Sequence, residues 1–209
     1  MKEYHKIETL FERAMDGSKR LIPGKWRNET VEFLRNSMWH FTEKIDGTNI
    51  RVHWDGHKVT FGGRTERAQI PAKLFTFLHE KFGGDEVEQL FEQKFGENTV
   101  TLYGEGYGAG IQKGGLYRPD VSFILFDVLI GDVWLTRDSV EDIAAAFGID
   151  VVPSLGFGDL DTAINYVRTK PQSRIGTAPM EGIVARPKVE VLDRMGRRVI
   201  VKIKVKDFE

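Results

Sequence analysis

A lysine at position 44 is the side chain of this chain best suited to forming a covalent intermediate. Lys44 lies in the segment Phe41-Thr42-Glu43-Lys44-Ile45-Asp46-Gly47-Thr48-Asn49, where apolar and polar residues alternate on both sides and predict two half-buried strands. Asp46-Gly47 is typical of the turn between them. An amine at a strand end is held in a fixed geometry, as a nucleophile requires. A K-x-D-G match by itself more often marks an exposed hairpin lysine, so the interpretation depends on the rest of the chain.

An arginine and a glutamate, each beside glycines, are the next candidates. Arg64 follows Gly62-Gly63, and its guanidinium suits phosphate or hydroxyl groups, although a surface salt bridge is the commoner role. Glu105 follows an expected strand over 99–103 and can accept hydrogen bonds from a sugar hydroxyl. Gly104-x-Gly106-x-x-Ala109 imitates a dinucleotide-binding fingerprint. We reject that interpretation because the residues after it predict a loop instead of a helix.

Charged side chains also mark the last two expected strands. Glu181 stands at the start of the apolar run 182–185. Strict alternation over 199–206 places Lys202, Lys204 and Lys206 on one face of a strand. This is either a solvated face or a face that binds an anion, which would relieve the repulsion among the three lysines.

The elements that must position these side chains follow from hydrophobic periodicity and turn signals. The expected helices span 72–82, 85–95 and about 161–169, with a further helix that Asp138 or Ser139 caps and that runs through Phe147. The expected strands include 39–44, 49–54, 58–61 and 121–130. Phe126 lies in the last of these strands and is either a core residue or a stacking face for a base. His53 and His57 straddle the turn at Asp55-Gly56, which favours structural or surface roles over a metal pair.

Composition narrows the class of protein. The chain has 209 residues, a net charge of -1, 41% hydrophobic residues and no cysteine, which indicates one soluble globular domain in a reducing compartment such as the cytoplasm. Disulfides, thiolate metal sites and cysteine nucleophiles are excluded. No apolar run approaches membrane-spanning length, and no P-loop motif is present. The near-neutral total argues against a purely electrostatic nucleic-acid binder but leaves room for a local basic face.

Taken together, these residues resemble the covalent nucleotidyltransferase superfamily of polynucleotide ligases and mRNA capping enzymes. Six elements occur in the superfamily's order, namely Lys44-Ile45-Asp46-Gly47, Arg64, Glu105, Phe126, Glu181-Gly182-Ile183-Val184 and Lys202-Ile203-Lys204. The resemblance runs from about Ile7 to Lys204. It implies an α+β fold in which two antiparallel β-sheets form a nucleotide groove flanked by helices, with residues 1–209 as a single adenylation domain.

Within that superfamily, the segment from Glu43 to Asn49 is most similar to the RNA ligase 2 family, whose motif commonly reads E-K-x-H-G-x-N. Asp46 replaces the histidine, as is usual in DNA ligases and capping enzymes. The sequence ends at Glu209, five residues after Lys204, so we expect no appended OB or helical domain. A partner protein that supplies a missing domain is compatible with this expectation.

The resemblance implies a role for each matching residue. Lys44 attacks the α-phosphorus of ATP, releases pyrophosphate and holds AMP through a phosphoramidate bond, while Lys202 and Lys204 stabilise the charge that develops on the phosphate. Glu181 engages Mg²⁺, with Mn²⁺ as the alternative ion. By the same resemblance, Arg64 and Glu105 contact the ribose, Phe126 stacks on the adenine face, and Glu43 reads the adenine edge. Asp46 and Asn49 organise the phosphate side.

The function implied by the resemblance is an ATP-dependent RNA ligase of the RNA repair type, which transfers AMP to a 5′-phosphate end and seals it to a 3′-hydroxyl. Basic residues near the C-terminus are candidates for nucleic-acid phosphate contacts: Arg186, Lys188, Arg194, Arg197 and Arg198. Two further enzyme classes stay open, an ATP-dependent DNA ligase and a capping-type guanylyltransferase. A module that binds nucleic-acid ends without sealing them is the alternative from a different class.

Overall fold

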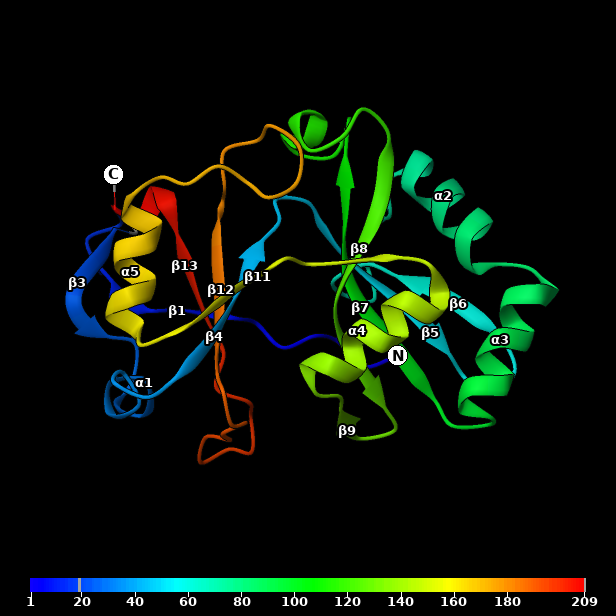
Figure 1. Cartoon of the computed structure of the whole chain (residues 1–209), viewed down its shortest axis with the longest axis horizontal. Helices are drawn as coiled ribbons and strands as arrows, with labels where there is room; N and C mark the ends of the chain where they lie inside the picture. Colours follow the sequence, from blue (N-terminus) through cyan, green and yellow to red (C-terminus); the bar gives the residue numbers. More distant parts are fainter. Residues whose placement is uncertain (19, 209) are drawn as a thin grey trace. The chain divides into compact units, whose positions relative to one another are not determined.

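The computed structural model describes residues 1–18 and 20–208, and its contacts divide the chain into two compact units (Figure 1). The first unit holds Met1–His5 and Asp46–Val152, and the second holds Lys6–Ile45 and Pro153–Glu209. Each unit has its own main sheet and its own hydrophobic core. The boundary between Ile45 and Asp46 falls inside the lysine motif, so Lys44 and Asp46 belong to different units.

The first unit is a sheet with strand order β10-β8-β7-β5-β6, and β9 pairs with β8. Its strands are β5 (Thr48–Trp54), β6 (Val59–Gly62), β7 (Val100–Gly108), β8 (Val121–Ile130), β9 (Val133–Trp134) and β10 (Asp150–Val151). Its helices are α2 (Ala72–Phe82), α3 (Asp85–Phe95) and α4 (Arg137–Phe147), with a 3-10 turn, η1 (Gly114–Leu116). All neighbouring strands are antiparallel except β8 and β10.

One face of this sheet packs against the helices. Ile50, Val52 and Trp54 alternate along β5 and are buried in the core with Leu74 and Leu78 of α2. Because strand side chains alternate between faces, the residues between them in β5 lie on the opposite face. Asn49, the candidate nucleotide contact in β5, therefore lies on that opposite face.

Two glycines that imitate a dinucleotide fingerprint instead allow close packing on the core face of β7. A Cβ on Gly104 would lie 2.3 Å from the ring of Phe123, and a Cβ on Gly106 would lie 2.3 Å from Leu74 Cδ2. The expected loop therefore begins later, because β7 continues through Gly108. Only the 3-10 turn η1 follows, which agrees with the rejection of a Rossmann motif.

The second unit is built around a sheet with strand order β1-β13-β12-β4-β11, and a separate hairpin pairs β2 with β3. Its strands are β1 (Glu8–Thr9), β2 (Phe11–Arg13), β3 (Leu21–Trp26), β4 (Trp39–Lys44), β11 (Ser154–Gly158), β12 (Gly182–Pro187) and β13 (Val201–Lys204). Its helical segments are α1 (Glu29–Phe33), α5 (Leu160–Arg168) and the 3-10 turn η2 (Val205–Phe208). Trp39, Phe41, Ile183 and Ile203 form its core with the buried side of α5.

The α+β fold class with two main sheets is confirmed, as are the bounds of strands 39–44 and 121–130 and of helices 72–82 and 85–95. The strand predicted over 199–206 is shorter, because the chain turns into η2 after Lys204 and Lys206 leaves the strand. Helix α4 begins at Arg137 with Thr136 at its N-cap position, so the predicted cap at Asp138 or Ser139 is wrong, while the predicted end at Phe147 is confirmed. Among the described residues, no helix has the length and hydropathy needed to cross a bilayer.

Candidate active site

Lys44, Glu181 and Lys204 meet on one face of the second unit's sheet. Gly182 pairs with Lys44 of β4 on one side and with Lys204 of β13 on the other, so Glu181 stands at the start of the strand between the two lysines. Lys44 Nζ donates to Glu181 Oε2 at 2.7 Å, and Lys204 Nζ donates to Glu181 Oε1. Lys202 alternates with Ile203 and so lies on the same face as Lys204. The structure therefore joins three of the predicted residues directly and places a fourth beside them.

This cluster is shielded from solvent and positively charged. The side chains of Lys44, Glu181 and Lys204 are only 22%, 16% and 18% exposed. Burial alone would raise the pKa of Glu181, but the charge of Lys44 and the hydrogen bonds from both lysines outweigh it, so the pKa lies below its ordinary value. One carboxylate thus faces two ammonium groups, and the surplus positive charge suits a phosphate.

Glu43 lies on the other face of β4. It alternates with Lys44, is 1% exposed, and accepts hydrogen bonds from Ser173 Oγ and from the backbone N–H of Arg174 at 2.9 Å. Both of its oxygens are thus engaged by the loop before β12. This placement gives Glu43 an anchoring role for that loop and does not support the predicted contact with an adenine edge.

In the first unit, Asn49 and Glu105 are direct cross-strand partners of β5 and β7. Partners of this kind share a face, so their side chains lie together opposite the core. Asn49 Oδ1 is buried and has no hydrogen-bond partner. A buried carbonyl oxygen without a partner is costly, and a bound donor such as a water, a hydroxyl or an amine would satisfy it.

Phe126 occupies a β-bulge on the same sheet. Tyr103 pairs with Asp127 and Gly104 with Leu125, so Phe126 is the extra residue between two pairs. Its ring is partly exposed and meets Tyr4 edge-on at a centroid distance of 5.1 Å. Tyr4 also packs on Tyr103 and donates to Asp127 Oδ2 at 2.8 Å. The N-terminal segment thus supports Phe126 from one side, and no local sequence pattern signalled this contact.

Arg64 is exposed in the loop after β6, while a second arginine that the sequence reasoning missed holds that loop. Arg51 is 1% exposed and donates to the carbonyl oxygen of Gly63 at 2.8 Å and to that of Met1 at 2.9 Å. An arginine at an alternating position inside a strand is the signal that could have found it. Arg51 therefore fixes the backbone directly before Arg64.

The turn after the lysine is held by a tyrosine and a close backbone approach. The backbone N–H of Asp46 donates to Tyr117 Oη at 3.3 Å. A Cβ on Gly47 would lie 2.3 Å from the carbonyl oxygen of Gly106, so only glycine fits there without movement. Tyr117 is a second residue that the sequence reasoning did not assign to the site.

Comparison with solved structures shows the same fold. Naegleria gruberi RNA ligase matches as a variant with ATP and Mn (TM-score 0.66, 19% identity, 98% of this chain and 56% of that chain) and as a variant with AMP and Mn (TM-score 0.64, 18% identity, 86% and 53%). The complex of that ligase with PPi also matches (TM-score 0.63, 20% identity, 86% and 52%). The chain thus spans about half the length of these solved chains.

No curated protein gives a significant match. The family model described as RNA ligase covers residues 37–204, from just before the strand that carries Lys44 to the last residue of β13. That range includes every candidate residue discussed above except those of the N-terminal segment. The chain therefore belongs to the RNA ligase family.

Proposed function

We propose that this protein is an ATP-dependent RNA ligase that adenylylates itself on Lys44 and then joins a 5′-phosphate end to a 3′-hydroxyl end in RNA repair. The observation that carries the proposal is the cluster of Lys44, Glu181 and Lys204, in which a nucleophilic amine lies beside surplus positive charge. The family match supports the choice of RNA, and the solved relatives with ATP and AMP support the choice of nucleotide.

In the first step the neutral amine of Lys44 forms a bond to the α-phosphorus of ATP as the bond to the pyrophosphate oxygen breaks. Lys44 must lose a proton first, and Glu181 Oε2 is its hydrogen-bond partner at 2.7 Å. Lys204, on the other oxygen of Glu181, and Lys202 on the same face stabilise the negative charge that grows on the phosphate. Pyrophosphate leaves, and AMP stays on Lys44 as a phosphoramidate.

The nucleoside half of ATP requires contacts of its own. We assign the adenine face to the partly exposed ring of Phe126, and the ribose hydroxyls to Glu105 with its neighbour Asn49, whose buried Oδ1 needs a donor. Arg64 is assigned to the ribose and Asp46 to the phosphate side on the strength of the motif. These assignments rest on the resemblance and on the shared face of Asn49 and Glu105.

A divalent cation fits this donor set only as an ion shared with the nucleotide. Among residues 1–18 and 20–208, no group of three or more His, Asp or Glu side chains could form a protein-only metal site. Mg²⁺ typically binds through one or two carboxylates together with phosphates and water, and Glu181 would be that carboxylate, with Mn²⁺ as a substitute. When bound, the ion neutralises phosphate charge.

In the later steps the AMP moves from Lys44 to a 5′-phosphate, and a 3′-hydroxyl then displaces AMP as the new phosphodiester forms. In the second step an oxygen of the 5′-phosphate attacks the α-phosphorus of AMP and the bond to Lys44 breaks. In the third step the 3′-hydroxyl oxygen attacks the phosphorus of the RNA 5′-phosphate and AMP leaves. Negative charge develops on a phosphate in each step, and the positive charge that Glu181 does not neutralise would stabilise it.

The intact mass of the purified protein after incubation with ATP and Mg²⁺ tests the proposal. We expect a gain of one AMP in the wild type, none in Lys44→Ala, and an unchanged gain in Lys58→Ala, which removes an exposed hairpin lysine. Adduct formation from GTP instead would indicate a capping-type enzyme, and sealing of DNA but not RNA nicks would indicate a DNA ligase. A wild type that forms no adduct and seals no ends would refute the proposal.

A further inference from the structure

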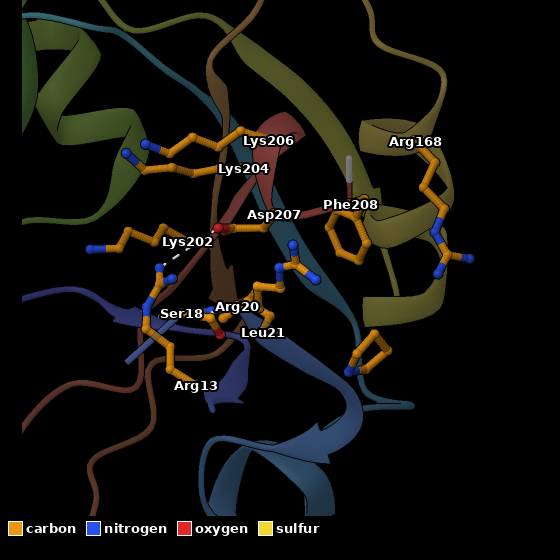
Figure 2. A pocket seen from close by; sticks show the side chains of 11 residues that line it. Arg13, Ser18, Arg20, Leu21, Arg168, Lys202, Lys204, Lys206, Asp207 and Phe208 are labelled. Atoms are coloured by element: carbon orange, nitrogen blue, oxygen red, sulfur yellow. Dashed lines mark hydrogen bonds and ion pairs between the residues drawn. The ribbon is translucent and has the colours of Figure 1, made fainter. Parts of the chain in front are cut away.

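The second unit contains a basic pocket that the assigned residues do not explain. Its volume is about 700 Å³, and it is lined by parts of the β2–β3 hairpin, α5, β13 and η2 (Figure 2). In the part of the chain that the structure describes, six cationic side chains line it: Arg13, Arg20, Arg168, Lys202, Lys204 and Lys206. In Figure 2 the three lysines extend side by side in the same direction. The candidate active-site lysines therefore form one wall of a larger basic surface.

The pocket has far more positive than negative charge. Among the described residues of its lining Asp207 is the single carboxylate, and its side chain is 4% exposed and pairs with Arg13 at 3.6 Å. Lys204 pairs with Glu181 and Arg13 with Asp207, but cations still outnumber these carboxylates, and Arg20 and Lys206 are exposed. An anion bound among them would lower their mutual repulsion. A polyanion is therefore the ligand class that this lining fits.

An aromatic side chain in the same pocket favours a nucleic-acid strand over a triphosphate. The guanidinium of Arg168 lies over the ring of Phe208 at 5.2 Å, and Leu21 and Pro23 add apolar surface. Cationic grooves with aromatic side chains are typical of sites for single strands. The phosphates of ATP share bridging oxygens and need a compact site, whereas RNA phosphates are separated by riboses and match cations spread over several elements.

Arg197 and Arg198, two of the phosphate contacts predicted from the sequence, do not line this pocket, and both pair with carboxylates. Arg197 pairs with Asp193 at 2.8 Å, and Arg198 pairs with Glu190 at 3.6 Å while its side chain is only 4% exposed. Phosphate contacts require exposed guanidinium or ammonium groups, which Arg198 does not offer, whereas the side chain of Arg197 is 61% exposed but already pairs with Asp193. The hairpin, α5 and η2 offer the larger basic surface.

We propose that the pocket lined by Arg13, Arg20, Arg168 and Lys206 binds the phosphates of a single RNA strand next to the end that is joined. The inference rests on the proposed function, because it makes Lys202 and Lys204 the point where this RNA site meets the adenylylation site. It assigns a substrate-binding role to an N-terminal hairpin and a C-terminal turn that the lysine motif does not include.

The test compares Arg20→Ala/Lys206→Ala with a matched control, Arg35→Ala/Lys25→Ala. Both variants remove one arginine and one lysine from the same unit, but the control residues do not line the pocket. Binding of a short 5′-phosphorylated oligouridylate is measured by fluorescence anisotropy over a range of salt concentrations. We expect the pocket variant to bind about 25-fold more weakly at 0.1 M salt, with a salt slope smaller by about 1.4, and the control to stay within about threefold.

Two further readouts distinguish the phosphates of RNA from those of ATP as the ligand of the pocket. Sealing of a chemically pre-adenylylated RNA should fall with RNA affinity in the pocket variant, whereas adenylylation of Lys44 from ATP uses no RNA and should stay within twofold of the wild type. A pocket variant that loses adenylylation and keeps RNA affinity would show that the pocket serves the ATP phosphates and overturn the inference, as would equal RNA affinities for both variants. Absence of adenylylation in the wild type would instead count against the proposed function, and the binding comparison would still decide on the pocket.

Discussion

Replacing Glu181 by glutamine tests whether this carboxylate holds two like charges together. Lys44 and Lys204 each bind one oxygen of Glu181, so without its charge two ammonium groups would remain close together in a site that is 16–22% exposed. At a separation of about 5 Å and an effective dielectric constant of about 20, their repulsion is roughly 3 kcal/mol. Relaxation of the lysine side chains would leave about 2 kcal/mol, which for a chain of this size corresponds to a fall in Tm of roughly 4–8 °C.

The assay is a double-mutant cycle of thermal unfolding with Glu181→Gln, Lys204→Met and the double variant. Removing the second ammonium group relieves the repulsion, so Lys204→Met should destabilise the wild type but stabilise Glu181→Gln. Pyrophosphate at constant ionic strength should raise the Tm of Glu181→Gln more than that of the wild type, because an anion takes the place of the lost carboxylate. Lys25→Met, which breaks an exposed pair with Glu12, serves as the control and should couple to neither change.

The reasoning fails if Glu181→Gln unfolds at the wild-type temperature. It also fails if Lys204→Met lowers the stability of Glu181→Gln further, since that result would mean that the lysine is held by packing of its aliphatic stem. A selective effect of pyrophosphate would in addition show that the cluster is an anion site before any nucleotide chemistry is measured.

Three further changes have definite expected outcomes. Gly182→Ala should lower the free energy of unfolding, measured in urea, by about 1–3 kcal/mol and abolish adenylylation. The new Cβ would lie 2.2 Å from the carbonyl oxygen of Ile203 and push β12 away from β13. Wild-type stability and wild-type adenylylation would contradict this. Arg51→Met should destabilise by about 2–4 kcal/mol because two backbone carbonyls lose a charged donor, and limited proteolysis should then cut beside Gly63 sooner. Because the pKa of Glu181 is lowered in the folded state, its ionised carboxylate stabilises the fold fully at pH values above the unfolded-state pKa of about 4.3. This stabilisation is lost as the pH falls through the folded-state pKa. The Tm difference between the wild type and Glu181→Gln should therefore shrink below about pH 4.

Local patterns were sufficient to predict most of the elements. Helices α2 and α3 each place an apolar residue every three or four positions and end at a glycine, and β4 alternates without exception, so their bounds follow from the sequence. The position of Glu181 between two lysines was only implied by resemblance. It depends on the pairing of β12 with both β4 and β13, and the pairing with β4 joins residues more than a hundred positions apart.

The hydrogen-bond partners of Glu43 were not predictable, whereas the face of β4 on which it lies was. The role of Glu43 depends on a loop 130 residues away, which supplies Ser173 to its carboxylate. Its charge and its place beside Lys44 suggested a ligand contact, but alternation along β4 turns it to the opposite face. Periodicity in fact contained this information, since Phe41, Glu43 and Ile45 share one parity and all are buried. The family resemblance implied a ligand contact for Glu43, whereas its position in the alternation of β4 predicts that its side chain faces the buried side of the sheet.

The bulge in β8 shows how one extra residue changes which side chains reach the candidate site. Phe123 and Leu125 are core residues before the bulge, and Val128 is a core residue after it, so the core-facing parity changes from odd to even. Phe126 and Asp127 can therefore both lie on the face opposite the core, where Tyr4 contacts each of them. In a regular strand two consecutive residues would point to opposite faces, and one of the two would enter the core. A bulge that re-aims a side chain in this way is common beside active sites, and it is the structural reason why an aromatic ring in an otherwise buried strand remains partly exposed to a ligand.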